Sequence, residues 1–244
     1  MLEGTNSISM KRRAWRAAAG GLAGAAILSL GAPARAETAY DMQVWTAAFV
    51  TAKLTGREPG ATSGVSAWLD LHARRTGGGV IGIVRPALGY RFSKDVSAWA
   101  GYAAIGLFDD APESRAQEHR AWQQGLFNFP LGALFVQLRP RLEERFREGQ
   151  PDVAFRARLL ARVNVTFGPD NPFFLATWTE PFFHLNDAAW GPRGGFDQNR
   201  LFLGLGIKGP AGTRVEVGYL NVTVSRPVGP SIAHNISVNL FADL

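Results

Sequence analysis

The stretch FVQLRPRLEERFR, residues 135–147, decides the fold because it fits two incompatible patterns. Apolar residues recur at every fourth position from Leu134 to Phe146, which is typical of an amphipathic helix. Polar and apolar residues also alternate along the same stretch, as in a strand, and only Glu144 interrupts this alternation. Pro140 favours the strand, because a proline inside a helix costs about 3 kcal/mol. We therefore predict a strand, with Pro140 at a bulge or a rim.

The same alternation continues through the rest of the chain. Residues 155–165 show it most clearly, since apolar side chains at the odd positions oppose mostly Arg at the even positions. Turn residues such as those at 168–171 separate the segments. Pro86 and Pro181 also fall inside segments and are expected at bulges or rims. The eleven alternating segments are 42–54, 63–76, 79–93, 95–108, 116–128, 132–147, 153–167, 172–185, 196–208, 213–224 and 232–242.

The spacing of these segments indicates a barrel. Short turns alternate with longer connections, which is typical of an up-and-down arrangement, and single-chain bacterial barrels have even numbers of strands. We therefore predict an all-β fold, a single antiparallel up-and-down transmembrane β-barrel of about twelve strands, in which one segment forms two strands. The alternative is ten strands, with residues 42–54 outside the wall.

The first 36 residues have the three parts of a secretory signal peptide. Basic residues at positions 11–13 and 16 precede an Ala/Gly-rich run over 17–30, which is followed by the A-x-A sequence at 34–36. The run is shorter than the roughly 20 residues of a membrane-spanning helix. We predict that residues 1–36 are removed and that residues 37–244 form a barrel in the outer membrane of a Gram-negative cell.

The composition limits the partners and the kinds of site. Removing residues 1–36 takes away five basic residues and one acidic residue, so the net charge falls from +6 to +2, which argues against a nucleic-acid partner. Because the chain has no Cys, it has no disulfide and no thiolate metal site, and we predict no metal and no cofactor. The predicted partners are membrane lipid and the outer-membrane assembly machinery, and the barrel is expected to be a monomer.

The contents of the two strand faces favour a membrane barrel over a soluble β-sandwich. A soluble sandwich exposes mixed Lys and Glu, whereas residues 37–244 contain 18 Arg and 3 Lys, and Arg is the better former of buried ion pairs. Several of the aromatic residues assigned to the apolar faces are expected to form girdles at the membrane interfaces. These aromatic residues are Trp45, Trp99, Trp122, Trp178, Tyr90, Tyr102 and Tyr219. The predicted lumen network consists of Arg85, Arg91, Glu118, Arg120, Arg139, Arg141, Glu143, Arg145, Arg156, Arg158, Arg162, Glu180, Arg200 and Glu216.

Six motifs, in this order along the chain, carry a resemblance to a known family. They are RPALGY (85–90), EHRAWQQ (118–124), RLEERF (141–146), EPFF (180–183), DQNR (197–200) and GYLN (218–221). With them the chain resembles the bacterial outer-membrane β-barrel family known as domain of unknown function 2490, over most of residues 41–242. The resemblance implies the location and the fold, and it implies no particular activity.

Two functions of the lumen are compatible with the sequence. A network in which several guanidinium groups share each carboxylate would fill a small barrel and stabilise it. An excess of Arg over Glu would instead suit an anion-selective, porin-like channel for small solutes. The filled lumen is our first expectation, because about ten strands leave little channel once Arg side chains occupy it.

The enzymatic alternative is an outer-membrane lipid-modifying hydrolase. Such chemistry needs a nucleophilic oxygen beside a base, yet none of the four His is followed by Ser two positions later. We therefore assign no catalytic residue, and Glu180, His184 and Asn186, on one strand face, are a secondary candidate for a general-base or ligand site. The G-x-G-x-x-G sequence at 204–209 precedes Pro210 and a turn instead of a helix, which argues against dinucleotide binding.

Overall fold

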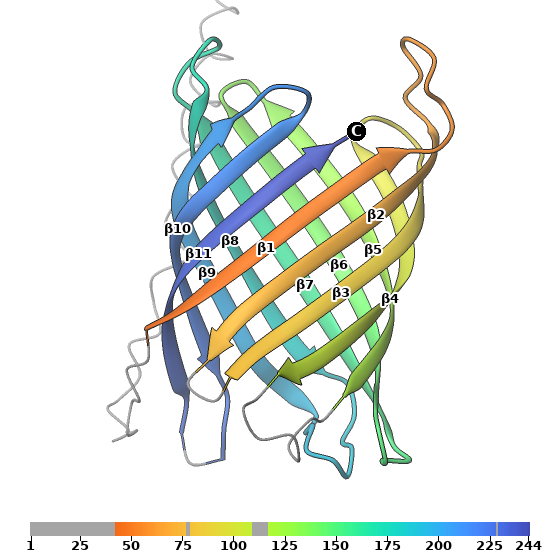
Figure 1. Ribbon diagram of the computed structural model, residues 1–244, viewed down its shortest axis with the longest axis vertical. Helices are drawn as coiled ribbons and strands as arrows, with labels where there is room; N and C mark the ends of the chain where they lie inside the picture. The colour runs from red at the N-terminus through yellow and green to blue at the C-terminus, as the bar shows by residue number, and fades with distance from the viewer. Residues whose placement is uncertain (1–41, 77–78, 109–116, 228) are drawn as a thin grey trace, which may run out of the picture. The chain divides into compact units, whose positions relative to one another are not determined.

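The computed structural model describes residues 42–76, 79–108, 117–227 and 229–244. Within these ranges eleven β-strands form the wall of a closed barrel (Figure 1). No helix in the same ranges is long and apolar enough to cross a membrane. The strands are β1 (Met42–Lys53), β2 (Gly64–Thr76), β3 (Gly79–Arg91), β4 (Val96–Phe108), β5 (Glu118–Leu131), β6 (Leu134–Arg147), β7 (Val153–Thr166), β8 (Phe173–His184), β9 (Gly195–Lys208), β10 (Thr213–Val224) and β11 (Ser231–Asp243).

The barrel closes between its first and last strands. All sequential neighbours pair antiparallel, whereas β1 and β11 run parallel, with Met42 opposite His234 and Thr51 opposite Asp243. The prediction of twelve or ten strands is therefore wrong for the described residues, although the eleven predicted segments match the eleven strands. An odd number of up-and-down strands leaves the first and last pointing the same way, so closure needs a parallel pair. Such a pair still supplies partners to the backbone N–H and C=O groups.

The parallel closure also separates the two ends of the described chain. We call the end of the barrel at which β11 finishes the C-terminal rim, and the end at which β1 begins the opposite rim. In Figure 1 the C-terminal rim is at the top and the connection between β8 and β9 lies at the opposite rim. Met42 and Asp243 therefore lie at opposite ends of the barrel.

Strand β6 shows the predicted alternation. Arg139 and Glu143 are 9% and 0% exposed, whereas Leu138 and Leu142 are 36% and 38% exposed. The charged side chains therefore face the lumen and the leucines face outward. Glu144, which interrupts the alternation, lies on the outer side three residues before the strand ends.

Three prolines lie well inside strands. The expectation that Pro86 and Pro140 mark a bulge or a rim is wrong, because the register of their strands is unbroken. Each instead lies where two successive pairs are missing from the ladder on one side, while the ladder on the other side continues. The strand therefore accommodates the missing proline N–H without a change of register. Pro181 lies beside a register shift between β8 and β9, as expected.

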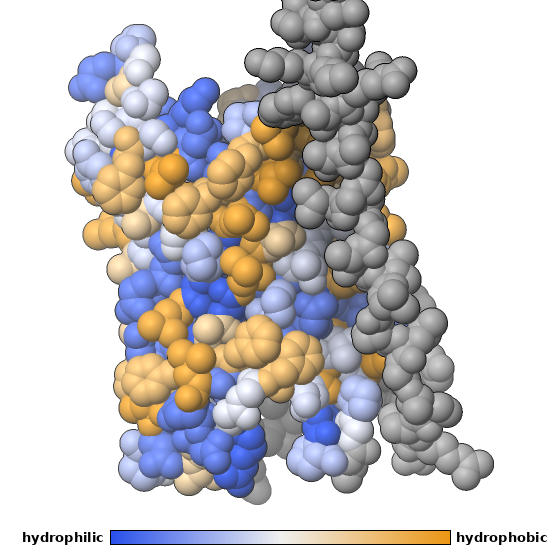
Figure 2. Space-filling view, turned by 180° about the vertical axis from the view of Figure 1, so that it is seen from behind, coloured by the Kyte–Doolittle hydropathy of each residue, from blue (hydrophilic) through white to orange (hydrophobic). Residues whose placement is uncertain are grey.

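Apolar side chains cover much of the outer wall and are interrupted by polar residues (Figure 2). Leu88, Leu203 and Leu205 are 54–61% exposed although they belong to strands. The predicted outward position of the tyrosines agrees with the structure, since Tyr102 and Tyr219 are 47% and 45% exposed. Apolar exposure on this scale is typical of a surface that contacts lipid or another protein.

The tryptophans occupy the other face of the wall. Trp99 and Trp122 are 5% and 1% exposed inside the barrel, and Trp45 and Trp178 line a cavity there. The prediction that these four lie on the apolar, outward face is therefore wrong, and they cannot contribute to a girdle. Small residues on neighbouring strands make room for the rings, and a Cβ on Gly89 would lie only 2.3 Å from the Trp99 ring.

Candidate functional site

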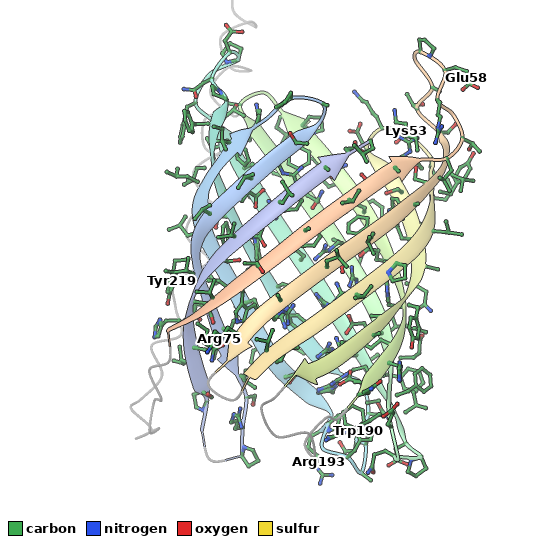
Figure 3. The ribbon with its side chains drawn as sticks, viewed as in Figure 1. Lys53, Glu58, Arg75, Trp190, Arg193 and Tyr219 are labelled. Carbon is green, nitrogen blue, oxygen red and sulfur yellow. The ribbon has the colours of Figure 1, made fainter. Side chains whose placement is uncertain are left out.

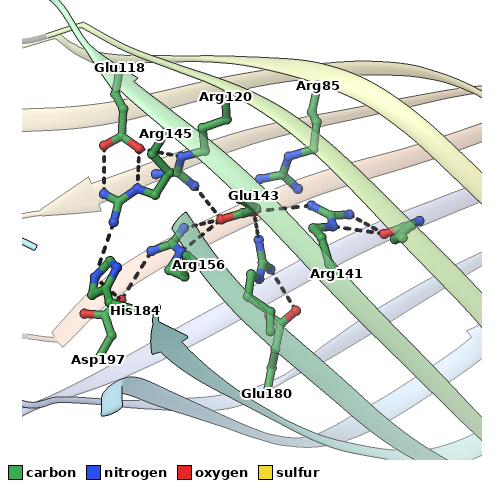
Figure 4. A network of polar contacts seen from close by, with 12 residues as sticks. Arg85, Glu118, Arg120, Arg141, Glu143, Arg145, Arg156, Glu180, His184 and Asp197 are labelled. Carbon is green, nitrogen blue, oxygen red and sulfur yellow. Dashed lines mark hydrogen bonds and ion pairs between the residues drawn. The ribbon is translucent and has the colours of Figure 1, made fainter. Parts of the chain in front are cut away.

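Glu143 on β6 is the centre of a buried ion-pair network in the lumen (Figure 4). Its carboxylate lies 2.6 Å from Arg156 and 2.5 Å from Arg158 on β7. Arg120 on β5 and Arg141 on β6 lie 3.6 Å and 3.8 Å from it. Glu143 is 0% exposed, so one carboxylate is surrounded by four cations from three consecutive strands. Charge-assisted contacts of this kind are stronger than neutral hydrogen bonds.

Two further carboxylates extend this network. Glu180 on β8 lies 2.7 Å from Arg158 and 3.2 Å from Arg139. Glu118, the first residue of β5, accepts two hydrogen bonds from Arg145, at 2.7 Å and 2.9 Å. A bidentate pair fixes the orientation of both side chains. The network thus joins the four consecutive strands β5, β6, β7 and β8 on their lumen face.

Sequence reasoning missed two carboxylates of the lumen. Asp70 on β2 lies 2.8 Å from Arg85, and its inward position follows from the alternation of its strand. Asp197 on β9 lies 3.3 Å from Arg156 and 3.4 Å from His184. Alternation would place Asp197 outside, but the register shift between β8 and β9 skips this residue. A bulge of this kind turns a side chain to the other face, which no sequence pattern indicated.

The remaining residues of the predicted lumen network either form a separate group or have no acidic partner within 4 Å. Glu216 on β10 lies 2.5 Å from Arg162 and 3.3 Å from Arg214. Arg91 and Arg200 have no carboxylate within 4 Å in the described part of the chain. The structure therefore joins most of the predicted set through shared carboxylates and leaves these two arginines apart.

The secondary candidate residues do not converge on one point. Glu180 is engaged by arginines of the network, whereas His184 Nε2 lies 3.4 Å from both Asp197 and Arg145. Asn186 lies beyond the end of β8, where its amide bonds to the backbone of β7. Glu180 and His184 thus both face the lumen but bind different partners. Asn186 stabilises the turn that follows β8.

The connection between β8 and β9, which carries Trp190 and Arg193, lies at the opposite rim (Figure 3) and contacts the network there. The indole N–H of Trp190 donates to the carbonyl of Asp152, at 3.0 Å. The Trp190 ring centre is 4.9 Å from the Arg145 guanidinium carbon, and Arg147 donates to the Trp190 carbonyl. Trp190 therefore forms a lid on the network from outside the strands.

A cavity of about 490 Å³ occupies the lumen between the network and the C-terminal rim. Its lining runs from Lys208 and Asp243 at that rim to Arg158 and Glu180 in the network. Eight lining side chains are Arg or Lys, and two are Glu or Asp. The aromatic lining consists of Trp45, Phe49, Trp68, Phe135, Phe174, Trp178 and Phe241. The cavity therefore combines an apolar surface with a positive charge.

Two of the lining arginines lie beside Trp45. The guanidinium carbon of Arg74 is 4.4 Å from the centre of the Trp45 ring, and that of Arg200 is 5.3 Å from the same ring. Arg200 belongs to the predicted lumen set, whereas Trp45 was expected outside and Arg74 was not assigned a role. The three side chains come from β1, β2 and β9, so only the closed barrel brings them together.

The partners of His72, His119 and His184 in the described part of the chain do not include the Ser or Thr hydroxyl of a catalytic pair. His72 lies 3.4 Å from Asp70, His119 lies 3.7 Å from Glu148, and His184 pairs with Asp197. In the described ranges none of these three bonds a Ser or Thr hydroxyl, the usual nucleophile beside a general base. The cavity lining has more cations than carboxylates, which suits the binding of anions.

Comparison with known proteins finds one family, a relative in sequence and a solved structure of partial similarity. Residues 42–232 match the family described as "Protein of unknown function (DUF2490)". An uncharacterized protein of Methylorubrum extorquens is 33% identical over 230 residues, which are 90% of this chain and 95% of that protein. Among solved structures, LpxR from Salmonella typhimurium is similar over 75% of this chain and 83% of its own, with 8% identity and a TM-score of 0.42.

Proposed function

The chain belongs to the DUF2490 family, and on this premise we propose that it is an outer-membrane β-barrel whose lumen is closed by the Glu143 network. The resemblance predicted from six motifs is confirmed by the match over residues 42–232. Removal of residues 1–36 before insertion is part of the proposal. The role that follows is a sealed barrel of the membrane, and not an open pore.

One observation carries the membrane location: a single strand buries charges on one face and exposes leucines on the other. In β6, Arg139 and Glu143 are at most 9% exposed, while Leu138 and Leu142 project outward. A soluble barrel would gain by the reverse arrangement, because burying apolar area contributes about 25 cal/mol per Å². The arrangement is favourable when lipid surrounds the wall.

Polar pairs on the outer wall support the same location. Tyr102 on β4 hydrogen-bonds to His119 on β5, and Tyr219 on β10 to His234 on β11. Each pair contains a histidine near the opposite rim, on the outside of the barrel. The strands have 12–14 residues, whereas about 9–11 cross a bilayer. We therefore assign this polar belt to the headgroup level, where Tyr side chains are favoured.

Cell fractionation combined with gel migration tests the membrane location. The protein is expected in the outer-membrane fraction, to start at Glu37, and to migrate faster in the gel before boiling than after it. Recovery from the soluble periplasm, without a migration shift on boiling, would refute the proposed location.

Single-channel recording tests the sealed lumen. Below the cavity, the network occupies the lumen with side chains that are almost fully buried, including Glu143 at 0% and Arg158 at 6% exposure. We expect no steady current in a planar bilayer from the refolded protein. An anion-selective unitary current would refute the sealed lumen and support the porin-like channel instead.

A further inference from the structure

The arginines that line the lumenal cavity differ in their acidic partners. Arg74 and Arg200 have no carboxylate within 4 Å among the residues that the structure describes. The charges that act most strongly on Arg74 are themselves arginines, with Arg200 first. The excess charge of the deep cavity is therefore concentrated on these two residues. The five lining arginines that do have such a carboxylate are Arg85, Arg139, Arg158, Arg162 and Arg214.

Two cations without a carboxylate in contact are unfavourable inside a barrel. Glu180 is the charge that acts most strongly on Arg200, but its contacts are with Arg139 and Arg158. Removing an ion from water costs several kcal/mol unless another charge or hydrogen bonds compensate. The Trp45 ring compensates only in part, since a cation–π contact contributes about 0.5–2 kcal/mol. The Nε atoms of Arg74 and Arg200 are buried and have no hydrogen-bond partner in the described structure. An anion between them would supply both the charge and the acceptors.

The rest of the cavity suits an apolar group. Seven aromatic rings line it, and its volume of about 490 Å³ lies within the roughly 300–1,000 Å³ of ligand pockets. A small inorganic anion would occupy only the end next to Arg74 and Arg200. The aromatic lining would then face an empty or hydrated space, which is less favourable than contact with an apolar body.

We propose that this cavity binds an organic anion with an apolar body, whose carboxylate or phosphate group lies between Arg74 and Arg200 beside Trp45. The apolar body extends toward the C-terminal rim along the aromatic lining. The site consists of lumen side chains alone, so it goes beyond the proposed membrane location and is tested separately from it.

The entrance at the C-terminal rim also favours anions. Lys208 is exposed there and lines the cavity, together with Arg214. The one lining carboxylate at this rim, Asp243, accepts a hydrogen bond from the Thr51 hydroxyl at 2.6 Å. Cations at the mouth of a cavity raise the local concentration of anions and their rate of association.

Calorimetric titration of the refolded full barrel in a nonionic detergent tests the proposal with four probes. Octanoate and octyl phosphate carry a charged group on an apolar chain, octanamide carries the chain without the charge, and inorganic phosphate carries the charge without the chain. Saturable binding of at least one of the two charged amphiphiles is expected, at least tenfold tighter than that of octanamide or inorganic phosphate. The tighter of the two identifies the head group.

Substitutions of Arg74 and Arg200 test whether these two side chains bind the anion. Arg74→Gln and Arg200→Gln are each expected to lower the affinity for the charged amphiphile at least tenfold. Arg200→Lys should retain most of this affinity because it keeps the positive charge. Arg75→Gln is the matched control, since Arg75 is the next residue but is exposed (Figure 3).

The urea midpoint of each variant distinguishes a binding role from a structural one. Arg74→Gln and Arg200→Gln remove charges that lack acidic partners, so midpoints at or above that of the unsubstituted protein are expected without ligand. Loss of the fold in both variants would show that the arginines are structural and would overturn the proposal. Equal affinities for octanoate, octyl phosphate and octanamide, or undiminished binding in both variants, would do the same.

Discussion

Trp45 on β1 lies directly opposite Arg74 on β2, with the guanidinium carbon 4.4 Å from the centre of the indole ring. Trp45 is also paired with Ser237 on β11, through the parallel ladder that closes the barrel. Arg200 approaches the same ring from β9, on the far side of this seam. The cation-rich end of the cavity therefore forms only when the first and last strands have paired.

Glu143 is expected to be the most important single carboxylate for stability. Glu143→Gln leaves four neighbouring arginines without their shared counter-charge, and breaking a buried ion pair on one side costs about 3–5 kcal/mol. Urea unfolding of the refolded barrel should show this loss. Glu58→Gln, in the exposed connection after β1, is the control and should leave the midpoint unchanged. Equal midpoints for both variants would contradict a structural role of the network.

The wall between β9 and β10 is expected to tolerate no side chain at Gly218. A Cβ there would lie 2.3 Å from the Leu203 carbonyl oxygen and 2.4 Å from the Cα of Gly204, which is directly opposite. Backbone atoms cannot move aside, so Gly218→Ala should cost about 1–3 kcal/mol in the free energy of unfolding. Gly194→Ala is the control, because its nearest neighbouring atom would be 3.5 Å away. An unaltered unfolding midpoint for Gly218→Ala would argue against this close approach of strands.

The odd number of strands predicts that the two ends of the barrel chain lie on opposite sides of the membrane. An epitope inserted just before Met42 and another after Leu244 should lie on opposite faces of the outer membrane, because β1 and β11 run parallel. Protease added to intact cells should remove one epitope, and permeabilised cells should lose both. Removal of both epitopes, or of neither, from intact cells would instead support an even number of strands.

Trp190 is expected to hold the connection between β8 and β9 over the network. Trp190→Ala removes the contacts with Arg145 and with the Asp152 carbonyl, so trypsin should cleave faster after the exposed Arg193. The rate of appearance of the two fragments measures this opening. Phe129→Ala removes an exposed ring near the C-terminal rim and should leave that rate unchanged. Equal rates in both variants would show that the lid does not depend on Trp190.

Much of the wall and the lumen could be predicted because both depend on local alternation. The side chains of a strand point to opposite faces in turn, so the inward position of Arg139 and Glu143 followed from their spacing alone. The same rule failed at Asp197, where a skipped residue in the ladder reverses the faces. For Trp122 the rule gives the inward face, because Trp122 follows Glu118 and Arg120 at a spacing of two, and the predicted outward position departed from it. For Trp99 the rule gives no answer, because β4 has no charged residue that marks the lumen face.

By itself, the sequence determined that the chain forms eleven alternating segments with charges gathered on one face, because these properties arise within single strands. Only the tertiary structure decided that the eleven segments close through a parallel pair of β1 and β11. It also decided which arginines share a carboxylate and which, like Arg74 and Arg200, face a cavity without one. The physical reason is that an ion pair needs contact within a few ångströms, and contacts across a lumen join residues that are far apart in the sequence.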